Sequence, residues 1–340
     1  MKIQYYIGRR LVLAIFVLFG ISVITFFIAR VVPSEPAARW IGLHATARQI
    51  AAARIELGLD KPLYIQYYVY MKNLVYGDWG ISIVTHQPVL KDIKEYIPAS
   101  LELIVFGMII GVIVGIFFGV LSATKKDKLT DHACRFISIG GVSLPTFWLG
   151  IVLQLVFFRQ LGILPLAGRI NSTLRFTFPL TKVTGFYILD SIITWNWPAF
   201  KSSFTHIILP ALTLSGYPMG LVTRMMRSSL IEILNEDYIR VTRAYGISER
   251  LIKYRYALKN AVSPTITVVA LCFAYTLTST FLIEAVFNWP GLGGYTSRAI
   301  LAMDYPAIMG VTLLVATFYV LINLLVDLIH AFIDPRIVLG

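Results

Sequence analysis

The chain has 340 residues, of which 57% are hydrophobic and 14% are charged, and its formal net charge is +12. Because soluble domains carry about 25% charged residues, this composition excludes an ordinary water-soluble protein. The positive charge is concentrated in connections between apolar segments, as membrane topology requires, so it does not indicate nucleic-acid binding.

Six segments of membrane length contain no charged residue and no histidine. They are Leu11–Ala29, Leu103–Thr124, Phe136–Phe158, Ile207–Thr223, Asn260–Ile283 and Tyr305–Val326. About 20 helical residues cross a bilayer core, and lipid cannot satisfy free backbone polar groups, so each segment is expected to be a helix. The fourth is short and contains Pro210 and Pro218, which predicts a kinked span that extends on both sides. The sequence therefore predicts an all-α integral membrane protein with six spans.

The connections between these spans differ in their content of Lys and Arg. With the N-terminus inside, the cytoplasmic connections hold 16 of the 30 Lys and Arg residues, although their combined length is about half that of the external ones. The positive-inside rule then predicts that both termini are cytoplasmic. The first span is expected to be retained, because its apolar run exceeds a signal-peptide core and Arg30-Val31-Val32-Pro33 offers no cleavage site. Cys134 and Cys272 are expected to be packing residues without a disulfide.

The long external connection 30–102 is rich in aromatic residues, namely Tyr64, Tyr67, Tyr68, Tyr70, Tyr76 and Trp79. Tyr and Trp favour the membrane–water boundary, so this region is expected to lie at the outer interface, with a small soluble cap as the alternative. The GDWG sequence of 77–80 predicts a turn. One helical face leading into the second span is formed by Val89, Ile93, Tyr96 and Ile97.

The second span has a glycine at every fourth position: Gly107, Gly111, Gly115 and Gly119. Glycines at this spacing form a smooth stripe on which another helix can pack closely in lipid. Membrane helices are generally rich in glycine, but three GxxxG repeats in one register favour a packing role. The stripe does not reveal whether the facing helix belongs to this chain.

Two further external connections carry turn and boundary residues. In 162–206, Trp195 and Trp197 are expected at the membrane boundary. The connection 284–304 predicts either a tight re-entrant turn at the outer mouth or a rigid surface loop. Its characteristic residues are Trp289, Pro290, Gly291 and Gly293.

Several kinds of chemistry lack their residues in this chain. It has no GxxxxGK[ST] sequence for an ATP site and no GxSxG sequence. Its five histidines are isolated, at His44, His86, His132, His206 and His330. We therefore expect neither enzymatic activity nor a metal site. The spans also lack the ionisable residues of ion-coupled carriers, since Glu284 and Asp327 fall at span ends, so the energy for any transport must come from another subunit.

The cytoplasmic segment 237–264 has the sequence DYIRVTRAYGISERLIKYRYALKNAVSP, with six Lys and Arg against two acidic residues. Its apolar residues recur at intervals of three and four, which predicts helix. Gly246 interrupts this pattern, and Ser248 is placed to cap a second helix. The prediction is a helical hairpin that a cytosolic partner grips, with a basic loop resting on anionic lipid as the alternative.

RVTRAYG followed by RYALKNAVSP resembles the EAA loop of binding-protein-dependent ABC importer permeases. Arg240-Val241-Thr242 stands where Glu-Ala-Ala is expected, and Tyr256-Ala257-Leu258 replaces Ile-x-Leu-Pro, a variant that resembles the dipeptide/oligopeptide branch. Seven further stretches, including LGLDKPLYIQY, HIILPALTL and EAVFNWPGLG, resemble the first permease subunit of that branch, and together these stretches cover nearly the whole chain in order.

The resemblance implies an ABC type I importer permease fold with a MetI-like core in a prokaryotic cell membrane. Residues 1–99 would hold the first span and the external region, 100–335 the core with five spans, and 232–260 the coupling loop. The implied partners are a homologous second permease, two cytoplasmic ATPases and an external solute-binding protein. ATP and Mg would be bound by the ATPases, and this chain would bind no cofactor.

In such a complex the loop docks into a groove of an ATPase subunit. The expected coupling residues are Arg243, Ala244, Tyr245, Gly246, Ile247, Ser248 and Glu249. Ala244, Tyr245 and Ile247 would form an apolar tip, and Gly246 is expected at positive φ.

The implied cargo is a peptide-like solute, but the same branch also carries oligosaccharides and nickel. The spans lack the His and Met clusters that favour nickel, and the sequence does not separate the other two. A secondary carrier or channel is a more remote alternative, as is a membrane enzyme or scaffold.

Overall fold

The computed structural model describes residues 3–31, 46–56 and 58–333. His44 and the end of the predicted cytoplasmic C-terminal segment, 334–340, lie outside the described residues. The described part is helical, apart from turns, loops and an isolated β-bridge between Ile81 and Pro88.

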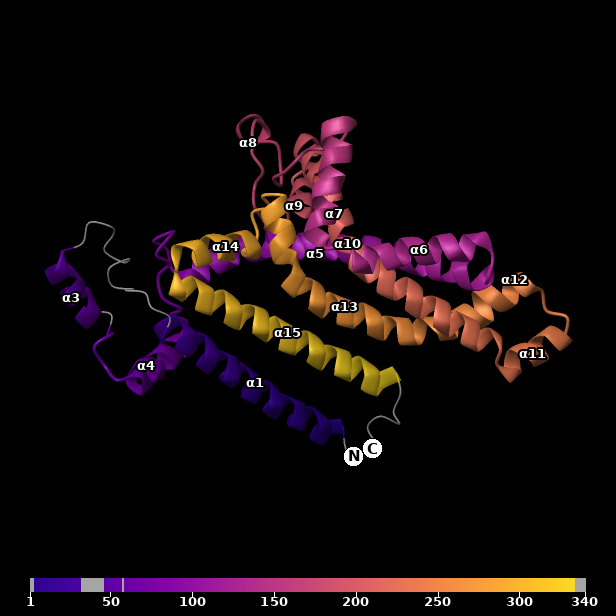
Figure 1. Ribbon diagram of the computed structural model, residues 1–340, viewed down its shortest axis with the longest axis horizontal. Coiled ribbons are helices and arrows are strands. Elements are labelled where there is room, and N and C mark those ends of the chain that lie inside the picture. Colours follow the sequence, from indigo (N-terminus) through magenta and orange to yellow (C-terminus); the bar gives the residue numbers. More distant parts are fainter. Residues whose placement is uncertain (1–2, 32–45, 57, 334–340) are drawn as a thin grey trace. The chain divides into compact units, whose positions relative to one another are not determined.

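The helices follow one another along the chain as labelled in Figure 1. They are α1 Ile3–Val31, α3 Ala47–Glu56, α4 Leu63–Val75, α5 Val89–Thr124, α6 Leu129–Ser143, α7 Thr146–Leu153, η1 Gln154–Gln160, α8 Leu174–Thr177, α9 Tyr187–Ile193, α10 Trp197–Leu234, α11 Asp237–Ala244, α12 Glu249–Leu251, η2 Ile252–Ala257, α13 Leu258–Val286, α14 Leu292–Ala302 and α15 Tyr305–Ile333. The segments η1 and η2 are π-helical and continue α7 and α12.

The chain forms two compact units. The core unit contains Ile3, Pro98–Pro290 and the described residues from Leu321 onward. The N-terminal unit contains the described residues of Gln4–Ile97 together with Gly291–Val320. Helices α5 and α15 therefore each contribute residues to both units.

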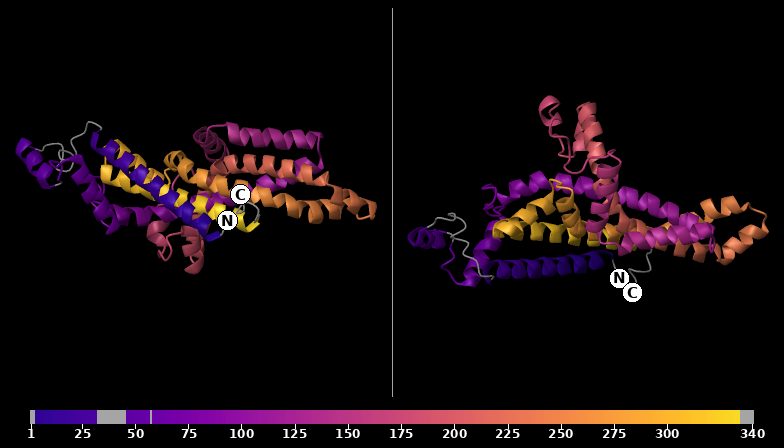
Figure 2. Two further views of the ribbon diagram at one scale, coloured as in Figure 1. Left: turned by 90° about the horizontal axis from the view of Figure 1, so that it is seen from below. Right: turned by 45° about the horizontal axis from the view of Figure 1, so that its top comes forward.

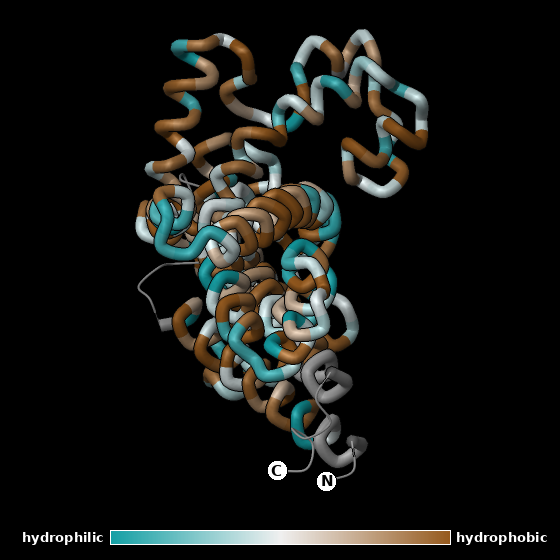
Figure 3. Tube along the Cα trace, turned by 90° about the vertical axis from the view of Figure 1, so that its right-hand side faces the viewer, coloured by the Kyte–Doolittle hydropathy of each residue, from teal (hydrophilic) through white to brown (hydrophobic). Residues whose placement is uncertain are grey.

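Four stretches of the described chain are long and apolar enough to cross a membrane: Gly8–Arg30, Val89–Thr124, Glu249–Val286 and Tyr305–Leu325. The pair formed by α6 and α7–η1 adds a fifth if it is counted as one broken span. Hydrophobic residues are frequent in the helices of the protein (Figure 3). The prediction of an all-α protein with several apolar helices of membrane length is therefore confirmed.

The predicted short fourth span is the 38-residue helix α10, which extends on both sides of the apolar run and includes Pro210 and Pro218. The side chain of Asn196 caps its first turn by accepting a hydrogen bond from the Ala199 amide at 3.1 Å. Helix α10 packs against α6, α7, α9 and α13, and many of its buried residues are Ser, Thr or Gly. These small polar residues lower the hydropathy of α10, which explains why it is not among the apolar stretches.

The predicted third span is not one straight helix. Helix α6 ends at Ser143, α7 begins at Thr146, and the two are bent by 110°. Leu144 between them is extended, with φ −77° and ψ 135°, because Pro145 disfavours a helical conformation in the preceding residue. Pro145 then occupies the N-cap position of α7, where the helix does not use a backbone N–H. The segment Phe136–Phe158 has no charged residue, so its sequence predicted one continuous span and did not indicate this break.

The core of the N-terminal unit forms around the start of α5. Val89 and Ile93 are buried against Tyr295 and Ala299 of α14 and against α15. This confirms the helical face predicted ahead of the second span. The predicted turn at 77–80 is also present, with positive φ at Gly77 and at Gly80.

Candidate functional site

Within the predicted coupling loop 232–260, α11, α12 and η2 form a hairpin that joins α10 to α13 (Figures 1 and 2). Its buried face is apolar. Ile239 of α11 and Ile252 of η2 are fully buried, and they pack in one cluster with Met226 and Leu230 of α10. The hairpin is therefore fixed to the end of α10 by its own core.

The turn of the hairpin depends on Gly246. Its φ is 75°, which confirms the expected positive value, and its amide donates a hydrogen bond to the Arg243 carbonyl at 2.9 Å. A β-carbon added there would meet no atom within 4 Å. The requirement for glycine is therefore conformational and not steric. Ser248 occupies the cap position of α12, but its side chain makes no capping hydrogen bond.

The tip of the hairpin presents an aromatic side chain between charged ones. Tyr245 is 82% exposed and Ala244 is exposed, whereas Ile247 is half-buried against the hairpin core. Ile247 therefore supports the tip from within. Arg243 Nε donates to Glu249 Oε1 at 2.7 Å, which joins the two sides of the turn.

The four glycines of α5 all face α10. A β-carbon on Gly107, Gly111, Gly115 or Gly119 would lie 2.6–2.8 Å from a side-chain carbon of Leu214, Pro218, Val222 or Met226, respectively. The contacts advance by four residues on both helices in the same direction, so α5 and α10 run parallel. The side chains of α10 thus fill the groove that the glycines leave open.

A second close contact joins α10 to α6. A β-carbon on Gly220 would lie 2.3 Å from Val142 Cγ2, and one on Gly141 would lie 2.6 Å from the Gly216 carbonyl oxygen. Sequence reasoning missed this interface, although Gly216 and Gly220 have the same spacing of four. Helix α10 therefore packs tightly on two sides, and it leads directly into the hairpin.

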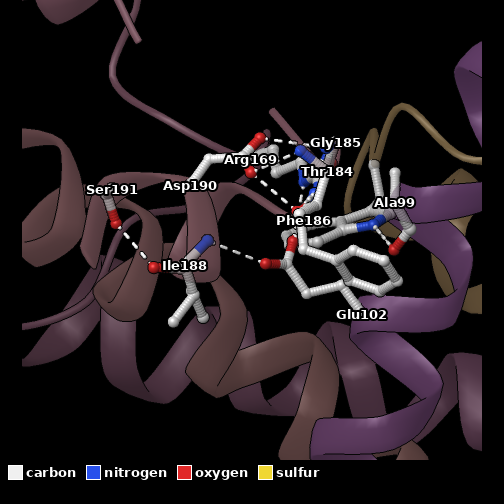
Figure 4. A network of polar contacts seen from close by, with 10 residues as sticks. Ala99, Glu102, Arg169, Thr184, Gly185, Phe186, Ile188, Asp190 and Ser191 are labelled. Atoms are coloured by element: carbon white, nitrogen blue, oxygen red, sulfur yellow. Dashed lines mark hydrogen bonds and ion pairs between the residues drawn. The ribbon is translucent and has the colours of Figure 1, made fainter. Parts of the chain in front are cut away.

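A buried ion pair holds the connection 162–206 against α5 (Figure 4). Arg169 Nη2 lies 2.5 Å from Glu102 Oε2, and both residues are about 4% exposed or less. The second carboxylate oxygen of Glu102 accepts from the Ile188 amide at 2.8 Å, and the guanidinium lies 3.8 Å from the Tyr187 ring centroid. No short-range pattern pointed to this pair, because its partners are 67 positions apart.

The predicted mouth loop begins with a buried anchor. Trp289 is 2% exposed, and its Nε1 donates to the Ala99 carbonyl at 2.8 Å. Nearby, Ser100 Oγ donates to Glu284 Oε1 at 2.5 Å. Gly291 precedes α14, and Gly293 lies in the first turn of that helix. Gly291 and Gly293 belong to the N-terminal unit, whereas Trp289 and Pro290 belong to the core unit.

Removing the carboxylate of the buried pair is expected to destabilise the protein. Glu102→Gln leaves the Arg169 guanidinium buried without a counter-ion, which costs about 3–5 kcal/mol. The measurement is the thermal unfolding midpoint of the detergent-purified complex. Asp237→Asn is the matched control, because its pair with Arg240 is largely exposed and contributes about 1 kcal/mol or less. Equal shifts for both variants would contradict a structural role for the buried pair.

Within the part of the chain that the structure describes, no three His, Cys, Asp or Glu side chains are placed to hold a metal ion. Cys134 and Cys272 are both buried and free, as expected.

Two family models match this chain. Residues 115–339 match the model described as "Binding-protein-dependent transport system inner membrane component". Residues 3–104 match the model of the N-terminal part of a binding-protein-dependent transport system membrane component.

Curated relatives match it over nearly their whole length. The chain is 42% identical over 332 residues to a dipeptide transport system permease protein of Alkalihalophilus pseudofirmus, covering 98% of both chains. It is 43% identical over 323 residues to a probable D,D-dipeptide transport system permease protein of Escherichia coli K12, covering 95% of this chain and 94% of that protein. A glutathione transport system permease protein of Escherichia coli O1:K1 is 34% identical over 98% of both.

Proposed function

This chain belongs to the family of binding-protein-dependent transport system inner membrane components, and from that premise we propose that it pairs with a homologous second permease to form the path of a peptide-like solute. An external binding protein delivers the solute, and two cytoplasmic ATPases supply the energy. The chain has six spans with both termini in the cytoplasm, and α10 and the broken pair α6 and α7–η1 supply the two spans beyond the four apolar stretches.

The observation that carries this proposal is the hairpin. It has a buried core on α10, an exposed aromatic tip at Tyr245 and a turn that requires positive φ at Gly246. A loop that only rested on lipid would need neither a defined turn nor rigid packing on a central helix. A groove in a cytosolic subunit would need both, because a loose tip cannot transmit a displacement.

The side of the membrane on which the hairpin lies is tested by single cysteines. Ser248→Cys in the hairpin and Ser172→Cys in the connection 162–206 are both at exposed positions, and the native cysteines are buried. An impermeant maleimide added to intact cells is expected to label Ser172→Cys, whereas Ser248→Cys should react only in inverted vesicles. Labelling of both from one side would contradict the topology.

The same two variants test whether an ATPase subunit binds the hairpin. A short bifunctional thiol reagent is expected to link Ser248→Cys to an ATPase subunit in the assembled complex, and Ser172→Cys serves as the matched negative control. Absence of the cross-link from a complex that hydrolyses ATP and transports would defeat the assignment.

The peptide-like cargo is supported by the relatives, which are named for dipeptides and glutathione. The deciding measurement identifies the ligand that the partner binding protein retains on purification. Recovery of an oligosaccharide in place of a peptide would leave the import mechanism intact and change only the cargo.

A further inference from the structure

A cluster of three polar side chains joins α5, α6 and α10 next to the hairpin. Ser122 comes from the last turn of α5, Asp131 from the first turn of α6, and Arg227 from α10. Ser122 and Asp131 are fully buried, and the Arg227 side chain is 22% exposed. The residue before Arg227 is Met226, which belongs to the apolar core that fixes the hairpin to α10. The polar cluster therefore lies directly beside that core.

The guanidinium of Arg227 holds the carboxylate of Asp131 through two hydrogen bonds. Nε donates to Oδ1 at 2.9 Å, and Nη2 donates to Oδ2 at 2.7 Å. The Ser122 hydroxyl donates to the same carboxylate and accepts from Arg227 Nε at 3.1 Å. The Asp127 amide adds a further hydrogen bond to Asp131 Oδ2 at 3.0 Å. Such a two-pronged contact between arginine and a carboxylate fixes orientation as well as distance.

The glycine contacts of α10 with α5 and α6 have a different character. They are the glycine stripe of α5 and the close approaches at Gly141 and Gly220, where apolar and backbone atoms meet. Small residues let helices approach closely in a membrane, but these contacts are not directional. A fully satisfied buried polar network, in contrast, rigidifies the elements that it joins. The polar cluster therefore fixes the register of α5 and α6 on α10 at the end where the hairpin begins.

Helix α6 leads from the polar cluster toward the other end of α13. It is the first half of the broken pair, and α7 follows it after the bend. A β-carbon added to Gly150 of α7 would lie 3.1 Å from the Phe287 ring and 3.3 Å from Thr213 Cγ2. Phe287 directly follows α13, whereas the hairpin precedes that helix. A displacement of the hairpin that is passed to Asp131 is therefore passed through α6 and α7 to the opposite end of α13.

We propose that Ser122, Asp131 and Arg227 are positioning residues that make α5, α6 and α10 follow the hairpin as one body. The inference rests on the proposed function, because the hairpin is displaced only if an ATPase subunit grips it. Without the polar cluster, the hairpin and α10 would move while α6 stayed behind. ATP hydrolysis would then continue without matching uptake of solute.

The first test measures how many solute molecules the reconstituted complex takes up per ATP hydrolysed. Arg227→Lys keeps a counter-ion for Asp131, so the complex should still assemble, but a lysine ammonium cannot reproduce the two-pronged contact. Loss of a charge-assisted hydrogen bond changes an equilibrium about tenfold, so uptake per ATP is expected to fall about tenfold. Arg224→Lys is the matched control, at an exposed position of the same helix, and it should behave like the unaltered protein.

A second measurement follows the joint movement directly and needs no solute. Spin labels on Arg135→Cys of α6 and Ser228→Cys of α10, both at exposed positions, report the distance between these helices by pulsed electron paramagnetic resonance. Cys134 and Cys272 are buried and should not be labelled. In the assembled complex this distance is expected to stay the same when ATP and vanadate are added. In the presence of Arg227→Lys it should shift, or its distribution should broaden.

The outcomes separate this inference from the proposed function. An unchanged ratio of uptake to hydrolysis in Arg227→Lys, or the same distance distribution with and without that substitution, would overturn the role of the polar cluster. Loss of the assembled complex in Arg227→Lys would also overturn it, because the polar cluster would then be a structural support only. If the unaltered complex hydrolysed ATP without uptake, the proposed function would fail, and the distance measurement would still decide whether the polar cluster joins α6 to α10.

Discussion

Replacing Gly246 with valine is expected to abolish uptake while leaving the complex assembled. The φ of 75° is strained for any residue with a β-carbon, by about 1–2 kcal/mol, and most strained for a β-branched one. Gly246 precedes the apolar stretch Glu249–Val286, so the spans should fold normally. The turn would relax to negative φ and carry Tyr245 away from its present position.

This result is measured as ATPase activity and uptake of the reconstituted complex, with and without loaded binding protein. Stimulation of ATP hydrolysis by loaded binding protein should be lost in Gly246→Val. Gly246→Asn should retain much of it, because asparagine tolerates positive φ. Gly162→Val is the matched control, since Gly162 has φ 65° and equally open surroundings but lies far along the chain from the hairpin. Normal uptake by Gly246→Val would mean that the hairpin does not couple the ATPases to transport.

The double variant Gly111→Leu, Gly115→Leu is expected to lose most of the assembled complex. A β-carbon on Gly111 would lie 3.0 Å from the Ser215 carbonyl oxygen, and one on Gly115 would lie 3.0 Å from the Met219 carbonyl oxygen. Backbone atoms cannot rotate away, so α5 and α10 must separate. Overpacking costs about 1–3 kcal/mol per site, and the lost contact removes the packing energy that holds membrane helices together.

The yield of complex in mild detergent measures this effect, and uptake should fall in proportion. Gly140→Leu is the control, because a β-carbon on Gly140 of α6 meets nothing within 4 Å. A second arm pairs Gly115→Ala with Val222→Gly, which removes both Val222 carbons that lie 2.8 Å from the added β-carbon and should restore part of the yield. Normal assembly of the double leucine variant would show that the stripe does not hold α5 on α10 in the membrane.

The sequence by itself predicted the all-helical class and the four long apolar stretches, because hydrophobic length and the three-to-four residue period are local properties. It also predicted the hairpin and the positive φ of its glycine, since a break in helical periodicity at Gly246 is visible within a few residues. The glycine stripe was recognisable for the same reason, although its partner was not.

The tertiary structure decided which surfaces meet. The packing of the stripe on α10 and the pairing of Glu102 with Arg169 both join residues far apart in the chain. Such contacts depend on the path of the segments that connect the helices, and the periodicity of residues within one helix does not predict that path. The bend at Pro145 is an intermediate case, because its cause is a single residue. An apolar run without charged residues is nevertheless compatible with a straight span and with a broken one, since an apolar helix surface can pack against lipid or against protein.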